Sequence, residues 1–240
     1  MKRFLVTVLT ASTVILTPGL ALAAPAGIFT GDVAAQRDHV DPIVSPGVRS
    51  AHEHCFYGGT PVSTVETSEG LRGKATTMDV QTNHTAIWIP CVYEDGVLLP
   101  QATQHGILVY YKPVKGTEVI FPEDFGSVTR RYGYRCGTGG GSFSLLPPTI
   151  CTSGDLVVTL IFEFPENPLF PTVQAYIRLN VGSGAVGNIT LGGPVLDVDG
   201  AHGPETMHGD YFFGHDRAAY QRFLDACVIP SRACGRNPVP

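Results

Sequence analysis

Glycine and proline divide this chain into short segments, and this punctuation is the feature that most constrains its fold. Of the 240 residues, 28 are glycine and 19 are proline, and both types interrupt long helices. In residues 172–181, Val173, Ala175, Ile177 and Leu179 share one face of an extended chain. Further strands, rich in β-branched and aromatic residues, are predicted in residues 85–93, 106–113, 155–164 and 188–198. The sequence therefore predicts a mainly β protein with a β-sandwich-like or distorted antiparallel sheet fold.

One segment near the end of the chain has helical rather than alternating periodicity. In residues 215–227, apolar side chains recur at helical spacing, and Asp216 stands where an N-cap would accept the first free amide hydrogens. We expect a C-terminal amphipathic helix that packs one face on the sheet and ends near Cys227.

The N-terminus resembles a secretory leader. Lys2 and Arg3 precede an apolar run that ends at Leu16, and small residues follow as far as Ala23. The run is too short to span a bilayer, and no later segment is long enough. We therefore expect a signal peptide at residues 1–23 and a single secreted, extracellular domain at residues 24–240, without a transmembrane segment.

All six cysteines follow the leader, and an even number in an oxidising compartment indicates three disulfides. Six cysteines allow fifteen pairings. The preferred set is Cys55–Cys91, Cys136–Cys151 and Cys227–Cys234, the last two because their short loops close easily. A zinc cluster is a weaker alternative, because the chain has no Cys-x-x-Cys pair.

Two histidines one residue apart form the first candidate site. In an extended strand, residues i and i+2 point to the same side, so His52 and His54 would present two imidazoles on one face. Glu53 and Cys55 would point the other way. Two histidines alone do not complete a metal site, because stable binding needs three or four ligands.

A second cluster of titratable side chains, in residues 200–216, could complete that site. Its glycines would let His208 and Asp210 face a common point. If this loop folds against His52 and His54, four polar side chains share one cavity open to solvent. They could hold a divalent metal through His52, His54 and His208, or form an acid/base site in which Asp210 orients an imidazole and raises its pKa. The opposing interpretation is that these histidines only hydrogen-bond backbone groups.

Charge and motifs exclude several function classes. The net charge is −5, and only two of the basic residues, Arg130 and Arg131, form an adjacent pair in the domain, so nucleic acid is not an expected partner. The chain contains no Gly-x-Ser-x-Gly elbow, His-Glu-x-x-His motif or Walker loop.

Five stretches of the chain carry a recognisable combination of motifs: residues 41–59, 88–93, 108–113, 121–125 and 208–227. In these stretches the chain resembles a family of secreted proteins of filamentous fungi and mycelial bacteria, the domain of unknown function DUF1996. The resemblance implies that this chain is a shortened member and that the polar positions matching the family motifs are Asp41, His52, His54, His208, Asp210 and Asp216. Asn83 stands where the family has an aspartate, and Met78 where it has a cysteine.

The family implies no settled reaction, so function is predicted from the residues. We expect a carbohydrate-directed protein that binds or cleaves cell-wall or extracellular polysaccharide, with exposed aromatic rings to stack on sugars and His52, His54, His208 and Asp210 as its polar site. The alternative is a non-catalytic structural or cell-envelope interaction protein, in which the same residues lock the early segment to the late loop.

Overall fold

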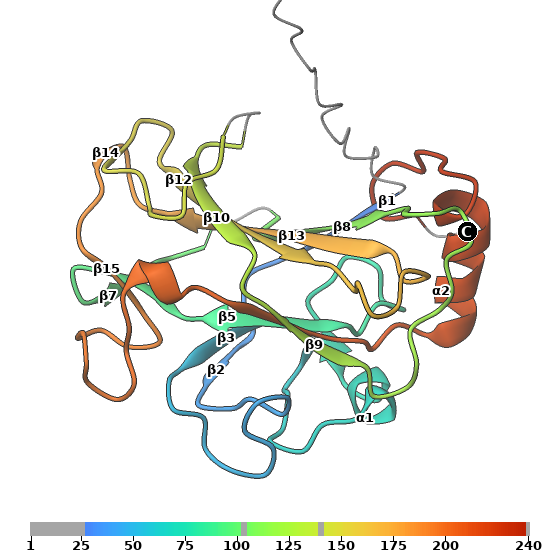
Figure 1. Cartoon of the computed structure of the whole chain (residues 1–240). Coiled ribbons are helices and arrows are strands. Elements are labelled where there is room, and N and C mark those ends of the chain that lie inside the picture. The colour runs from blue at the N-terminus through green and yellow to red at the C-terminus, as the bar shows by residue number, and fades with distance from the viewer. Residues whose placement is uncertain (1–26, 102–104, 139–141, 239–240) are drawn as a thin grey trace, which may run out of the picture.

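The protein is described by a computed structural model that covers residues 27–101, 105–138 and 142–238; the predicted signal peptide at residues 1–23 lies outside these ranges. Two antiparallel sheets form two layers (Figure 1), and each is named here after its central strand. The β13 sheet has the order β1 (Gly27–Gly31), β8 (Ile107–Lys112), β13 (Thr172–Asn180), β12 (Asp155–Phe162) and β10 (Tyr132–Cys136). The β5 sheet has the order β2 (Gln36–Asp38), β3 (His54–Thr60), β5 (Ala86–Pro90), β16 (Gly209–Phe212) and β9 (Gly126–Thr129), and β4 (Ala75–Thr76) pairs with β3. The prediction of a mainly β fold is confirmed.

Shorter elements decorate the two layers. A small sheet joins β15 (Ile189–Leu191), β6 (Val92–Glu94) and β7 (Val97–Leu98), and a two-stranded ribbon joins β11 (Ile150–Cys151) and β14 (Gly184–Ala185). A short helix, α1 (Ser68–Arg72), and a 3-10 turn, η1 (Pro204–Thr206), lie in connections. The prediction of one strand through residues 188–198 is wrong beyond Leu191, because Gly192 turns the chain with a φ of 74°.

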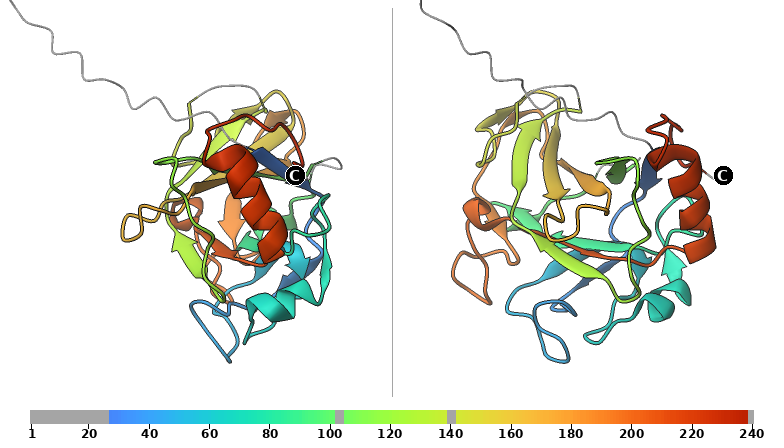
Figure 2. Two further views of the ribbon diagram at one scale, coloured as in Figure 1. Left: turned by 90° about the vertical axis from the view of Figure 1, so that its right-hand side faces the viewer. Right: turned by 45° about the vertical axis from the view of Figure 1, so that its right-hand side comes forward.

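The C-terminal helix forms as predicted. It begins as α2 (Arg217–Phe223) and continues as a π-helical segment, η2 (Leu224–Val228). The Asp216 carboxylate accepts a hydrogen bond of 2.8 Å from the amide of Ala219, which makes Asp216 the N-cap. Tyr220 and Phe223 are buried, and Figure 2 shows the helix lying across one side of the two-layer body. Among the described residues, no helix is long and apolar enough to cross a membrane.

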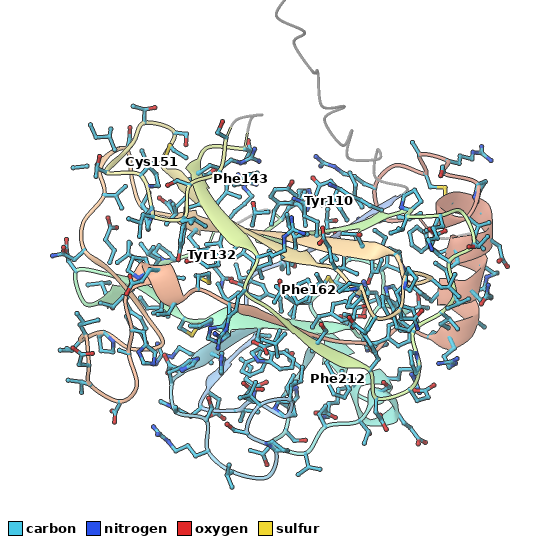
Figure 3. The ribbon with its side chains drawn as sticks, viewed as in Figure 1. Tyr110, Tyr132, Phe143, Cys151, Phe162 and Phe212 are labelled. Carbon is cyan, nitrogen blue, oxygen red and sulfur yellow. A yellow bond between two sulfur atoms is a disulfide. The ribbon has the colours of Figure 1, made fainter. Side chains whose placement is uncertain are left out.

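Alternation along the strands divides the apolar residues between two cores. The main core lies between the sheets, where β13 buries the predicted face from Val173 to Leu179 (Figure 3 labels Phe162 in this core). The second core lies on the other face of the β5 sheet, where Val40 packs with Phe56, Trp88 and Phe212. The segment around Val40 therefore covers the outer face of the β5 sheet, and the candidate site lies on that same face.

Three disulfides are present in the same pairs that the sequence predicts. Cys55–Cys91 links β3 to the end of β5, Cys136–Cys151 links β10 to β11, and Cys227–Cys234 ties the tail to the C-terminal helix. Such bonds fit a protein of an oxidising compartment.

Candidate functional site

Strand register brings the two ends of the chain together. His54, the first residue of β3, pairs with Pro90 of β5, and Asp210 of β16 pairs with Trp88 of the same strand. Residue numbers run in opposite directions along two antiparallel strands, so two residues back from Asp210 along β16 corresponds to two residues forward from Trp88 along β5. His208 therefore comes level with Pro90, on the opposite side of β5 from His54. The side chains at 208 and 210 point to the face on which His54 lies.

His52 precedes β3 and is seated by the turn at Gly192. The amide of Glu53 donates a hydrogen bond of 3.0 Å to the carbonyl of Gly192. A Cβ atom at Gly192 would lie 2.6 Å from the Cβ of His52, closer than packed carbon atoms approach. The glycine thus allows the turn to press His52 toward its partners. The ring centre of His52 lies 4.5 Å from that of His54 and 5.1 Å from that of His208.

The hydrogen bonds of the three imidazoles fix which ring nitrogens are free. His54 Nδ1 lies 3.0 Å from the carbonyl oxygen of Val40, and His208 Nδ1 lies 3.1 Å from that of Thr206. A carbonyl only accepts, so both Nδ1 atoms carry hydrogen and both Nε2 atoms carry a lone pair. His54 Nε2 is buried without a hydrogen-bond partner. His208 Nε2 faces His52 Nε2 at 3.3 Å.

Two carboxyl groups extend this histidine cluster (His52, His54 and His208) inward. Asp41, His54 and Asp210 each offer a ligand atom within 4.8 Å of the others, as do the three histidines among themselves. Asp41 Oδ1 accepts hydrogen bonds from the amides of Ile43 and Val44, both at 3.0 Å. Both oxygens of Asp210 are buried without a hydrogen-bond partner. His54 belongs to both groups and links the histidine cluster to the acid pair (Asp41 and Asp210).

Burial controls the protonation of these groups. Desolvation, followed by repulsion from His208 and His202, lowers the pKa of His52 to about 4. Desolvation also lowers the pKa of His54 and of His208, so all three imidazoles are neutral at pH 7. Burial raises the pKa of Asp210 well above its usual range, and the Asp41 charge adds to this. The expectation that Asp210 would raise the pKa of an imidazole is therefore wrong: desolvation dominates, and the imidazole pKa values fall.

Only the outer part of the site reaches solvent. His52 and His208 line an open pocket of about 570 Å³, the histidine pocket, whose wall also contains Arg130, Tyr132, Leu145, His202, Glu205, Thr206 and Met207. His54 and Asp210 are fully buried and do not line it. The expectation that all four predicted residues share one cavity open to solvent is thus correct for His52 and His208 and wrong for His54 and Asp210, which lie behind them.

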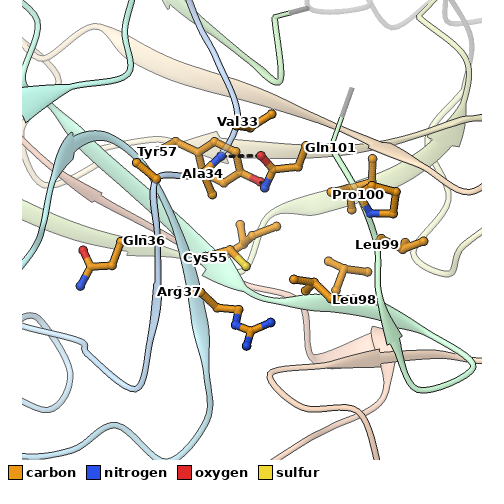
Figure 4. Close-up of a pocket in the computed structure, with 14 residues that line it drawn as sticks. Val33, Ala34, Gln36, Arg37, Cys55, Tyr57, Leu98, Leu99, Pro100 and Gln101 are labelled. Atoms are coloured by element: carbon orange, nitrogen blue, oxygen red, sulfur yellow. Dashed lines mark hydrogen bonds between the residues drawn. The ribbon is translucent and has the colours of Figure 1, made fainter. Parts of the chain in front are cut away.

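A second pocket, of about 310 Å³, lies against the other face of β3 (Figure 4). Its polar groups are already engaged: Gln101 donates to the hydroxyl of Tyr57 at 2.7 Å and accepts from the amide of Ala34, Cys55 is in a disulfide, and Arg37 pairs with Glu53 at 3.1 Å. The described residues that line it include no histidine, aspartate or glutamate. The histidine pocket is therefore the candidate functional site.

The structure places the remaining predicted residues as follows. Asp41, which only the family resemblance indicated, joins the buried half of the site. Asp216 caps α2 and is not part of the site. The sequence contains no sign of Arg130 or Tyr132, which carry no local motif: Arg130 lies between β9 and β10, and Tyr132 is the first residue of β10. Glu205 belongs to the cluster of titratable side chains in residues 200–216 and lies in the η1 turn, but it was not assigned to the site.

Comparison with known proteins gives one match. Residues 41–135 match the family model of a domain of unknown function, DUF1996, which is consistent with a shortened member of that family. The match includes Asp41, His52 and His54 and ends before His208 and Asp210. No curated protein and no solved structure matches the chain.

Proposed function

We propose that this chain is an extracellular metalloprotein that holds one divalent transition-metal ion between His52, His54, His208 and the buried carboxyl pair, and that its histidine pocket takes carbohydrate. The observation that carries the metal proposal is the convergence of three imidazoles, of which His54 and His208 each keep a lone pair on Nε2. Carbonyl acceptors hold His54 and His208 in this state, as backbone carbonyls commonly do behind metal-binding histidines.

The distance between two of these nitrogens suits a tetrahedral ion. With metal–nitrogen bonds of about 2.0–2.1 Å, two nitrogen ligands of a tetrahedral zinc ion are about 3.3–3.4 Å apart. His52 Nε2 and His208 Nε2 are 3.3 Å apart. The unpartnered oxygens of Asp210 lie within ligand distance of His54 and Asp41. Asp210 would therefore reach an ion from the inner side, next to His54, and burial costs its carboxylate least when it is paired with a cation.

Imidazole and carboxylate ligands together suit zinc and its transition-metal neighbours. The low pKa values of the histidines keep them neutral near pH 7, so they need not lose a proton to bind. If three imidazoles alone held the ion, its fourth position could take a water, and the ion would then supply Lewis-acid activation of that water; with the carboxylate also bound, the site would be closed and structural. Of the side chains proposed to hold the ion, only His52 and His208 line the pocket. They would lie between the ion and a carbohydrate bound in the pocket.

The wall of the histidine pocket supports carbohydrate as the ligand class. Tyr132 donates its hydroxyl to the carbonyl of Glu205 at 2.6 Å, which holds the aromatic ring in the wall, where a sugar ring could stack on it. Arg130, His202 and Glu205 surround it with hydrogen-bonding groups suited to sugar hydroxyls. Cell-wall or extracellular polysaccharide is the source that the predicted leader and the three disulfides favour.

One observation also favours the structural alternative. The same 3.3 Å between His52 Nε2 and His208 Nε2 accommodates an N–H···N hydrogen bond if His52 carries its hydrogen on Nε2. In that case the histidine cluster locks the segment before β3 to β16, and no ion is needed.

Zinc titration by calorimetry, on protein purified without a histidine tag and stripped of metal, separates the two. The metalloprotein proposal predicts one site per chain in the wild type, loss of that site in His52→Ala and His208→Ala, and an unchanged site in His105→Ala, whose imidazole lies outside the cluster. A glycan array with the metal-loaded protein then tests the ligand class. Absence of zinc binding in the wild type, with a lowered melting temperature in His52→Ala, would establish the structural alternative instead.

A further inference from the structure

A third pocket, with a concentration of positive charge, lies on the outer face of the β13 sheet. Register places Arg135, Val157 and Arg178 side by side on β10, β12 and β13, and their side chains point away from the main core. Tyr110 and Tyr176 lie on the same outer face, on β8 and β13; Figure 3 labels Tyr110 there. Together with His105, Leu108, Thr138 and Arg236 they line a pocket of about 240 Å³, the arginine pocket.

Aromatic rings hold Arg135 in position. Its guanidinium carbon lies 4.8 Å from the ring centre of Phe143 and 5.5 Å from that of Tyr176, so the cation is flanked by two π faces. Phe143 packs closely on Gly133, where an added Cβ would lie 2.6 Å from the Cβ of Phe143. Arg135 Nε is buried without a hydrogen-bond partner, and one terminal nitrogen donates to the carbonyl of Thr138 at 3.3 Å.

Arg236 is brought to the pocket by the C-terminal tail. The Cys227–Cys234 disulfide anchors the tail two residues earlier. Hydrogen bonds from Ile28 to Gly235 and from Asn237 to Ile28 then fix the backbone on both sides of Arg236. A basic side chain is thus held over the sheet by a disulfide and two backbone bonds, although its own chain segment is exposed.

The charge of this pocket is not neutralised from within. Arg178 pairs with Asp155 at 2.8 Å, and His105 lies 3.8 Å from Asp79. Within the described ranges, no carboxylate forms a salt bridge with Arg135 or Arg236. Two unpaired guanidinium groups in one small pocket stand out on a chain whose net charge is −5.

We infer that the arginine pocket binds a uronic-acid unit of an acidic polysaccharide. Guanidinium groups recognise carboxylates through paired N–H···O bonds, which accounts for Arg135 and Arg236. Tyr110 and Tyr176 meet edge to face, with ring centres 5.0 Å apart, and offer apolar ring surface beside those cations for a pyranose face. The volume suits one sugar residue rather than a long chain. The pocket shares no residue with the histidine pocket, so this site does not depend on the proposed metal.

The test compares methyl β-glucuronide with methyl β-glucoside, which has the same ring but no charge, by NMR titration of the mature protein at low ionic strength. We expect the glucuronide to shift the resonances of Tyr110 and Tyr176 and the glucoside to bind at least tenfold more weakly. Raising the ionic strength from about 0.01 M to about 1 M shortens the screening length from about 30 Å to about 3 Å and should weaken glucuronide binding.

Variants locate the site. Arg236→Gln, on the exposed tail, should weaken glucuronide binding at least tenfold, and Arg135→Lys should weaken it while preserving the net charge. Arg131→Gln, which removes an exposed arginine outside the pocket, and His52→Ala should leave it unchanged. Equal binding of the glucoside, equal binding of inorganic phosphate, or an unchanged affinity in Arg236→Gln would each overturn the inference. A wild-type protein that binds glucuronide but not zinc would refute the metal proposal and support this inference.

Discussion

Two buried carboxyl groups of this protein should respond in opposite ways to the same substitution. Asp210 is fully buried and neither of its oxygens has a hydrogen-bond partner. Glu118 is almost as buried, but its Oε1 accepts hydrogen bonds from the amides of Val114, Lys115 and Gly116, at 2.6, 2.6 and 3.0 Å. Replacing each by leucine therefore compares a polar group that burial penalises with one that satisfies three donors.

The expected magnitudes follow from these contacts. Burying an unpartnered polar group costs about 1–3 kcal/mol by mutational data, so Asp210→Leu should stabilise the metal-free protein by about that amount. In a domain of this size, about 1 kcal/mol corresponds to about 2–4 °C in melting temperature. Glu118→Leu leaves backbone donors unsatisfied and should destabilise the protein by about 1–3 kcal/mol.

Zinc should reverse the effect of Asp210→Leu, so that the wild type becomes the more stable protein. If the Asp210 carboxylate is a ligand, zinc at 100 times its dissociation constant stabilises the wild type by about 2.7 kcal/mol, and much of that gain should be missing in Asp210→Leu. Thermal denaturation followed by circular dichroism measures the melting temperatures of the wild type and of Asp210→Leu, each with chelator and with zinc. A metal-free Asp210→Leu protein that melts well below the wild type would refute the reasoning, because the carboxyl group would then be stabilised by partners of its own.

Three further predictions concern the Cys55–Cys91 disulfide, the stability of the protein in acid and the positioning of His52 by Gly192. Cys55→Ala/Cys91→Ala opens a loop with a sequence separation of 36 and should cost about 4 kcal/mol in urea unfolding by the loop-entropy relation; a loss under 1 kcal/mol would contradict it. Burial lowers the pKa of His215 to about 3, below its usual 6.5. Between these two pH values the unfolded chain binds a proton that the native state does not. The free energy of unfolding should therefore fall as the pH falls from about 6.5 to about 3, by up to about 1.4 kcal/mol per pH unit. His215→Phe should reduce this slope, measured by urea unfolding at several pH values. Gly192→Ala, which places a methyl group against His52, should weaken zinc binding at least tenfold by calorimetry, and unchanged affinity would show that the turn does not position the imidazole.

Local patterns in the sequence were sufficient for most of the fold. The alternation from Val173 to Leu179 predicts β13 because one face of that strand lies in the main core. The helical spacing after Asp216 predicts α2 because only one face of that helix is buried. The strand predicted through residues 188–198 failed where Gly192 turns the chain, since composition does not reveal a positive φ.

The proximity of the three histidines could be predicted from the sequence, but the burial of the site could not. Spacing selected His52 and His54, because i and i+2 side chains share a face of an extended strand. His208 was selected from the cluster of titratable side chains in residues 200–216. The burial of Asp210 follows from a contact distant in sequence: the segment around Val40 covers the outer face of the β5 sheet and builds a second core there. Strand β16 is therefore buried on both faces, and alternation within residues 209–212 carries no sign of this.

Anomalous X-ray scattering from crystals of the untagged protein grown with zinc tests the central claim most directly. The account predicts one strong zinc peak about 2.0–2.1 Å from His52 Nε2, His54 Nε2 and His208 Nε2, with a carboxylate oxygen of Asp210 or Asp41 at a similar distance. Crystals that contain zinc but show no peak among these side chains, with His52 and His208 still joined by a hydrogen bond, would contradict it.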